Sequence, residues 1–211
     1  MEPLILRVLK TSEVESKEEE LLSYISSERK EKALSYAFRK DRLLSLGAAY
    51  FLRRYVPGPL LTGPYGKLLS PSLHFSLSHS GDTILFLASS SPCGVDIEAR
   101  EKPMEGLREY AFSALEAARL RKGSEIIDAW TRKEALAKAE GSGFALTPIQ
   151  EIPSEEGEVL YLSKTYVVKT LPSRLFKAHV SLAYEKIGAE ELLVNRIEER
   201  IEIRASPSGK E

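Results

Sequence analysis

The chain has 211 residues, of which 43% are hydrophobic and 29% charged, and its formal net charge is -1. This composition is typical of a folded globular protein, and the length suits one large domain or two small ones. The balanced charge gives no broad basic surface for nucleic acid, and no segment approaches the roughly 20 apolar residues of a membrane span. The single cysteine, Cys93, cannot form an internal disulfide. We therefore expect a cytoplasmic protein that binds neither nucleic acid nor membranes.

The first half of the chain begins with the apolar segment LILRVLK at 4–10, which predicts a strand. Residues 14–57 carry apolar side chains near helical spacing and predict helix almost throughout, with Asp41 able to begin a second helix. Segment 57–67 is rich in Pro and Gly and predicts a loop. Three short strands are expected next, at 73–80, 83–89 and 93–99.

The second half is expected to contain two helices and then two strands, at 104–122, 124–140, 159–171 and 177–186. Gly141 and Gly143 are typical residues to end the second helix. Residues 190–204 fit helix or strand, and the tail 205–211 is expected to fray.

Helices followed by strands therefore occur twice. This order predicts an α+β fold of two units, 1–100 and 101–211, that meet near residue 100. No clear sequence repeat relates the two units, so any symmetry between them would be structural only.

Two acids lie on the predicted strand GVDIE at 94–98. Side chains alternate along a strand, so Asp96 and Glu98 share one face while Val95 and Ile97 point into the core. Like charges about 4 Å apart repel by about 4 kcal/mol at an effective dielectric near 20. The pair indicates either an exposed polar face, where water screens the charges, or a site whose ligand is a cation.

A third acid lies on the predicted helix WTRKEALAKAEGSG at 130–143. Trp130, Glu134 and Lys138 recur every four residues and therefore share one helix face. Glu134 and Lys138 could form an ordinary surface ion pair. Alternatively, Glu134 could join the two strand acids in binding Mg²⁺, which prefers carboxylate oxygens and usually also binds substrate phosphates. Lys138 would then contact a phosphate beyond the metal.

The ordered set YGK, FSLSHSG, GVDIE and WTRKEALAKAEGSG, from about residue 65 to 143, resembles the 4'-phosphopantetheinyl transferases of the Sfp type. The resemblance implies transfer of the phosphopantetheine arm of coenzyme A to a serine of an acyl or peptidyl carrier protein. The by-product is adenosine 3',5'-bisphosphate, and Mg²⁺ is required. It also implies a pseudo-dimer of two similar α+β halves within one monomeric chain, with the active site between the halves.

The resemblance also implies roles for individual residues. Asp96, Glu98 and Glu134 match the metal-binding acids, and Glu134 also matches the proposed general base. Lys138 matches the lysine that binds the pyrophosphate. The residues matched to coenzyme A binding are Arg29, Lys32, Arg42, Ser45, Lys67, Ser78 and His79.

The motifs depart from the family pattern at three places. Leu68 replaces the proline of the usual Gly-Lys-Pro, and Ser76 replaces a common asparagine. The arginine expected shortly after Asp41 is displaced or absent.

Two other functions would use the same residues. A Mg²⁺-dependent nucleotide pyrophosphohydrolase would need no carrier protein, and a non-catalytic module would bind coenzyme A or a carrier without turnover.

Overall fold

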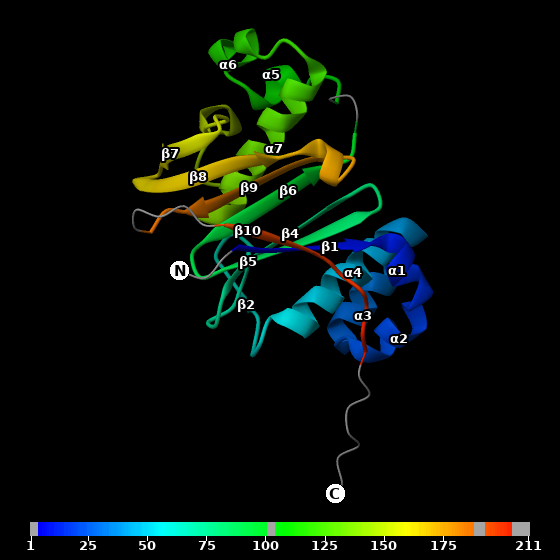
Figure 1. The fold of residues 1–211 in the computed structure, drawn as a ribbon. Helices are drawn as coiled ribbons and strands as arrows, with labels where there is room; N and C mark the ends of the chain where they lie inside the picture. The colour runs from blue at the N-terminus through cyan, green and yellow to red at the C-terminus, as the bar shows by residue number, and fades with distance from the viewer. Residues whose placement is uncertain (1–3, 101–103, 188–192, 204–211) are drawn as a thin grey trace, which may run out of the picture.

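The computed structural model describes residues 4–100, 104–187 and 193–203, and within these ranges it is a mixed α+β protein (Figure 1). Two four-stranded sheets have the strand orders β10-β1-β5-β4 and β6-β9-β8-β7. The strands of the first sheet are β1 (Leu4–Lys10), β4 (His74–Ser80), β5 (Thr83–Ser89) and β10 (Val194–Glu198). Those of the second are β6 (Cys93–Glu98), β7 (Gly157–Tyr161), β8 (Lys164–Leu171) and β9 (His179–Glu185). The expected α+β class is therefore confirmed.

The helices lie on the outer faces of the two sheets (Figure 1). The first sheet is covered by α1 (Thr11–Ser16), α2 (Glu18–Tyr24), α3 (Ser27–Leu34) and α4 (Arg39–Tyr55). The second sheet is covered by α7 (Gly123–Glu140), with α5 (Leu107–Ala111) and α6 (Ala114–Arg119) beside it. Two short 3-10 helices, η1 (Ile149–Glu151) and η2 (Ser173–Leu175), complete the set within the described ranges. None of the helices described combines the length and the hydrophobicity that crossing a membrane requires.

The two sheets pack against each other through their inner faces. One cluster of buried residues joins both sheets, with Leu6, Val8 and Leu87 from the first and Val95, Ile97, Val180 and Leu182 from the second. Burying side chains of this kind contributes about 1.5–3 kcal/mol each. The predicted alternation along β6 is confirmed, because Val95 and Ile97 face this core while Asp96 and Glu98 do not belong to it.

Three predicted elements are divided in the structure. The long helical segment 14–57 forms separate helices, α1 through α4. The predicted helix 104–122 is interrupted at Ser113, whose hydroxyl caps α6 in a capping box with Glu116. The predicted strand 159–171 is the hairpin β7–β8, because Leu162 and Ser163 take positive φ angles of 45° and 66° and reverse the chain.

Two further segments differ from, or refine, the prediction. The predicted loop 57–67 contributes Leu61–Thr62 (β2), which pairs with Leu68–Leu69 (β3) in a small hairpin. The ambiguous segment 190–204 contains the strand β10, while the predicted tail 205–211 lies outside the described residues.

Strands cross between the two predicted units. β6 belongs to the first unit by sequence but pairs with β9, and β10 belongs to the second but runs parallel to β1. Each sheet therefore contains strands from both sides of residue 100. The boundary near that residue stays a prediction.

Candidate active site

The functional side chains come from two elements that touch closely, β6 and α7. Gly94 on β6 makes this contact possible: a Cβ atom there would lie 2.0 Å from the carbonyl oxygen of Ala135 and 2.5 Å from the amide nitrogen of Ala139. No real side chain tolerates such distances, so α7 rests directly on the backbone of β6. Glu134 and Lys138 of α7 are thereby brought against Asp96, two residues along the strand from Gly94.

A cavity of about 410 Å³ opens where β4, β6 and α7 meet. Most of its polar lining consists of residues singled out in the sequence: Ser78, His79, Asp96, Glu98, Glu134 and Lys138. Trp130 of α7 and Ala48 of α4 also line it. The structure therefore places three separate sequence motifs around one cavity.

Lys138 lies at the centre of the charged groups. Its Nζ is 2.5 Å from Oδ1 of Asp96, 3.4 Å from Oε2 of Glu134 and 3.2 Å from Oγ of Ser78. Burial alone would lower the pKa of Lys138, but the two carboxylates outweigh burial and raise it. The ammonium therefore stays charged and holds two acids together on the wall of the cavity.

Glu134 carries the most perturbed carboxyl group of the cavity. Burial first, and the nearby Asp96 second, raise the pKa of Glu134 to about 7, although Lys138 opposes the shift. This is the behaviour of two carboxylates forced close together in a poorly solvated place. His79 responds to the same surroundings, because burial and the Lys138 ammonium lower its pKa and favour the neutral ring.

The donor chemistry of this cavity fits a hard divalent cation, since three carboxylates line one space. Among the described residues, however, no group of three or more His, Cys, Asp or Glu side chains is arranged to hold a metal ion. The three carboxylates have other partners instead. The Lys138 ammonium contacts Asp96 and Glu134, and Glu98 accepts hydrogen bonds from Ser80 and from the backbone N–H of Arg100.

The lysine predicted to bind the nucleotide, Lys67, contacts the end of α7. Its ammonium donates to the carbonyl oxygen of Lys138 at 2.5 Å and lies 3.5 Å from that of Ala139. A cation at this place stabilises a helix C-terminus. Lys67 and Lys138 also line a neighbouring cavity of about 300 Å³. Burial lowers the pKa of Lys67.

The remaining predicted coenzyme A residues lie on α3 and α4. Arg29 lines a separate cavity of about 490 Å³, and Lys32 is exposed in the last turn of α3. Arg42 forms an ion pair with Glu18 at 2.9 Å. Ser45 is partly buried one turn before Ala48, which lines the cavity of the acids. The structure therefore does not bring Arg29 and Arg42 to the lining of that cavity.

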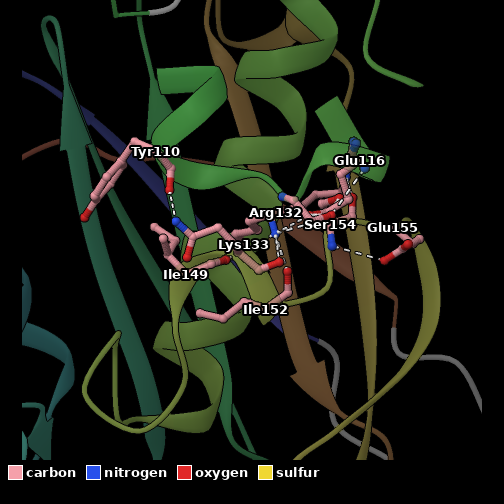
Figure 2. Close-up of polar contacts among 10 residues, drawn as sticks. Tyr110, Glu116, Arg132, Lys133, Ile149, Ile152, Ser154 and Glu155 are labelled. Carbon is pink, nitrogen blue, oxygen red and sulfur yellow. Dashed lines mark hydrogen bonds and ion pairs between the residues drawn. The ribbon is translucent and has the colours of Figure 1, made fainter. Parts of the chain in front are cut away.

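Lys133, which belongs to none of the predicted sites, has the most extensive polar network on α7 (Figure 2). Its side chain is fully buried, and its ammonium lies 3.0 Å from the Glu116 carboxylate and 2.5 Å from the carbonyl oxygen of Ile152. The carbonyl oxygens of Ile149 and Gln150 also accept from it. A lysine on an otherwise apolar helix face was the available signal, because such a group must find buried partners.

Neighbouring contacts extend the network of Lys133. Arg132 donates to the carbonyl oxygen of Ser154 at 2.5 Å, and the hydroxyl of Ser154 donates to Glu116 at 2.6 Å (Figure 2). Gln150 donates to the carbonyl oxygen of Tyr110. The network thus ties α5, α6 and segment 149–155 to α7, on a different side of the helix from the cavity.

Comparisons with known proteins identify the family that this chain resembles. Residues 92–181 match the model of the 4'-phosphopantetheinyl transferase superfamily. The chain is 28% identical over 144 residues to 4'-phosphopantetheinyl transferase ffp of Bacillus subtilis. The matched segment covers 60% of this chain and 64% of the relative. It is 29% identical over 146 residues to 4'-phosphopantetheinyl transferase Sfp of Bacillus subtilis (strain 168), with 61% and 65% covered. A 4'-phosphopantetheinyl transferase of Bacillus pumilus is 36% identical over 97 residues, with 42% and 41% covered.

The chain therefore matches less than two thirds of the length of each of these relatives. The matched family segment contains β6, α7 and the acids that face the cavity. The resemblance indicated by the motifs is confirmed: this chain is similar to the Sfp-like 4'-phosphopantetheinyl transferases, and its residues 92–181 match their superfamily.

Proposed function

We propose that this protein is a 4'-phosphopantetheinyl transferase, which moves the phosphopantetheine arm of coenzyme A to a serine of an acyl or peptidyl carrier protein. One observation carries the proposal. Asp96 and Glu98 of β6 and Glu134 and Lys138 of α7 line the same cavity, and all four lie in the segment that matches the family. The likeness to several named transferases supports the same reaction.

In the proposed reaction, the serine Oγ of the carrier attacks the phosphorus next to the pantetheine arm. A new O–P bond forms, and the bond from this phosphorus to the bridging oxygen breaks, which releases adenosine 3',5'-bisphosphate. Glu134 accepts the serine proton. Lys138 offsets the negative charge that grows on the departing phosphate. Both groups already lie together at the cavity, so the protein contributes mainly positioning and charge neutralisation.

Asp96, Glu98 and Glu134 would hold Mg²⁺, which when bound neutralises the pyrophosphate of coenzyme A. Lys138 would then pair with phosphate oxygens as well as with the acids. Ser78 and His79, on the same wall, would contact the phosphates of coenzyme A. Lys67 would contribute to the nucleotide site from the adjoining cavity.

Arg29, Lys32, Arg42 and Ser45 complete the proposed coenzyme A set. Their position on α3 and α4 means that the nucleotide would extend from the cavity of the acids toward these helices. Arg42 would have to exchange its ion pair with Glu18 for a phosphate. The pseudo-dimer of two similar halves, 1–100 and 101–211, remains part of the proposal, as do the monomeric state and the cytoplasmic location.

The test is the intact mass of an apo-carrier protein after incubation with this protein, coenzyme A and Mg²⁺. Transfer adds about 340 Da to the carrier, and a chelator abolishes the gain because the pyrophosphate then lacks its metal. A carrier with its acceptor serine replaced by alanine is the control. Carriers from fatty acid, polyketide and nonribosomal peptide synthesis should all be tried.

The other outcomes identify the alternatives. Release of adenosine 3',5'-bisphosphate from coenzyme A without any carrier would identify a pyrophosphohydrolase. Binding of coenzyme A with neither release nor transfer would identify a non-catalytic module.

A further inference from the structure

Three cavities of this chain adjoin one another, because neighbouring cavities share lining residues. The cavity of the acids shares Leu77 and Lys138 with the neighbouring cavity of about 300 Å³. That second cavity shares Leu68 with the cavity of about 490 Å³ that Arg29 lines. The three cavities therefore form a row that leads from the acids of β6 and α7 to the helices α3 and α4. We call this row the cavity track.

The far end of the cavity track is lined by two arginines from different helices. Arg29 lies on α3 and Arg53 in the last turn of α4, and Glu28 is the one acid among the lining residues. The charged side chains there are thus two cations and one anion. Neither arginine forms an ion pair with a residue of the described ranges, and the Cζ of Arg53 lies 5.9 Å from the ring centroid of Tyr24. Both guanidinium groups are therefore available to an anionic ligand.

The charges of coenzyme A match the two ends of the cavity track. Its anionic parts are the pyrophosphate, which the proposed function places beside Lys138, and the 3'-phosphate, which one ribose joins to it. A phosphate monoester carries close to two negative charges at neutral pH, and guanidinium groups pair with phosphate oxygens through two parallel hydrogen bonds. Ala48 of α4 lines the cavity of the acids, and Arg53 follows five residues later, an axial rise of about 7.5 Å. A ribose with its two phosphates, together with the length of an arginine side chain, spans such a distance.

We infer that Arg53 is a specificity-determining residue, which joins Arg29 in pairing with the 3'-phosphate of coenzyme A. This inference rests on the proposed function, because it takes coenzyme A to be the substrate. Arg53 belongs to none of the predicted sites. Arg42, which the resemblance assigns to coenzyme A, lies 2.9 Å from Glu18 and would have to leave that acid. Arg53 has no such ion pair to give up within the described ranges, so its guanidinium selects coenzyme A over the molecule that lacks the 3'-phosphate.

The next residue of α4, Arg54, offers a matched control. Both arginines are exposed in the last turn of the helix, and successive side chains point about 100° apart around the helix axis. The Cζ of Arg54 lies 5.6 Å from the ring centroid of Tyr55, and Arg54 does not line the cavity that contains Arg53. The two Arg→Gln substitutions therefore remove the same charge from adjacent positions, but only Arg53→Gln removes it from the cavity track.

The experiment is calorimetric titration of the full chain, without a carrier protein, with coenzyme A and with dephospho-coenzyme A, which lacks only the 3'-phosphate. We expect Arg53→Gln to weaken binding of coenzyme A by about 10-fold and to leave binding of dephospho-coenzyme A within about twofold. This loss is at the low end for a hydrogen bond between charged groups, because Arg53 is exposed. Arg54→Gln should leave both affinities within about twofold. Arg53→Lys should recover part of the loss, because it keeps the charge without the two parallel hydrogen bonds. In the transfer assay, Arg53→Gln should raise the KM for coenzyme A and leave kcat near the wild-type value.

The remaining outcomes separate this inference from the proposed function. Equal weakening of both ligands by Arg53→Gln would overturn the inference, since Arg53 would then not contact the 3'-phosphate. Equal effects of Arg53→Gln and Arg54→Gln would also overturn it, because only the general positive field would then matter. A wild-type chain that transfers the arm but binds the two ligands equally would overturn the inference and leave the proposed function intact. A wild-type chain that prefers coenzyme A through Arg53 but transfers nothing would support the phosphate site and overturn the proposed transfer.

Discussion

Two lysines lie on different sides of α7. Lys133 stabilises the fold, and Lys138 lines the candidate active site. Each forms an ion pair with a carboxylate. Lys133 also binds three backbone carbonyl oxygens, whose positions are set by the chain. Lys138 contacts two carboxylates and a hydroxyl that line a cavity. The partners therefore help to distinguish the structural lysine from the lysine at the site.

The same contrast explains which lysine could exchange partners. Lys133 has four acceptors within hydrogen-bonding distance and is fully enclosed, so its ammonium has no access to a ligand. About a third of the Lys138 side chain remains exposed, at 32%, on the wall of an open cavity. Substitutions on the two sides of α7 should accordingly affect stability and activity separately.

The largest expected effect is on the rate of transfer when Glu134 becomes Gln. We expect the rate to fall by about 10²–10⁴-fold, because a proton acceptor positioned in the transition state contributes that much. The free energy of unfolding should stay near the wild-type value, since Gln keeps the shape. The time course of carrier mass and a urea denaturation curve measure the two quantities. A variant with near-normal rate and unchanged Mg²⁺ dependence would exclude Glu134 as both base and ligand.

The next largest effect is on stability when Lys133 becomes Met. The Glu116 carboxylate would lose its cation and three carbonyl groups would lose a hydrogen-bond donor, while most of these groups remain shielded from water. Removing one member of a buried pair typically costs about 3–5 kcal/mol of unfolding free energy, measured by urea denaturation. Lys133→Met with Glu116→Gln is the control, and it should recover part of the loss. A folded Lys133→Met chain with normal stability and no transfer would place Lys133 in the reaction instead.

Gly94→Ala tests the close contact between β6 and α7, which places Glu134 and Lys138 at the cavity. The added methyl group would collide with the helix backbone, so α7 must shift away from β6. Overpacking of this kind typically costs about 1–3 kcal/mol. Gly58→Ala is the comparison: its φ of +77° is unfavourable for alanine, but no atom lies within 4 Å of the new methyl group. Urea curves for both should show the larger loss for Gly94, and transfer should fall only in that variant. Equal losses would mean that the close contact costs no more than one unfavourable φ angle.

Much of the site was predictable because its residues lie in regular elements. Alternation along β6 placed Asp96 and Glu98 on one face, and four-residue spacing placed Glu134 and Lys138 on another. Both patterns depend only on local geometry, which a sequence displays. The cavity that unites these two faces was not visible locally. The close approach of α7 to β6 depends on Gly94, and this role of Gly94 appears only when the helix is seen lying on the strand.

The parts that could not be predicted depend on contacts between distant segments. Lys133 was not singled out, and its acceptors at 149–152 are backbone carbonyl groups, whose approach to the helix carries no local sequence signal. Lys67 was predicted to bind coenzyme A, and its contact with the C-terminus of α7 was not predicted. The hairpin β7–β8 was hidden because Leu162 and Ser163, rather than Gly or Asn, take the positive φ angles.

The last prediction concerns Cys93, and it sharpens the comparison between the two sides of α7. Burial raises the pKa of the Cys93 thiol to about 12, with Lys67 opposing the shift. At pH 8 only about one thiol in 10⁴ would then be ionised, and the thiolate is the reactive form. Reaction with a disulfide reagent should therefore be very slow in the native chain and complete in urea.

Labelling of a buried thiol proceeds through opening of the structure, so its rate follows the population of open molecules. Lys133→Met should consequently speed the labelling of Cys93 in native buffer, because it lowers stability. Glu134→Gln should leave the rate unchanged, because it acts on the reaction. If both variants speed labelling equally, the two sides of α7 are not separable, and the division between a structural lysine and a catalytic face is wrong. If neither does, Cys93 is reached by a local opening that leaves the Lys133 network intact.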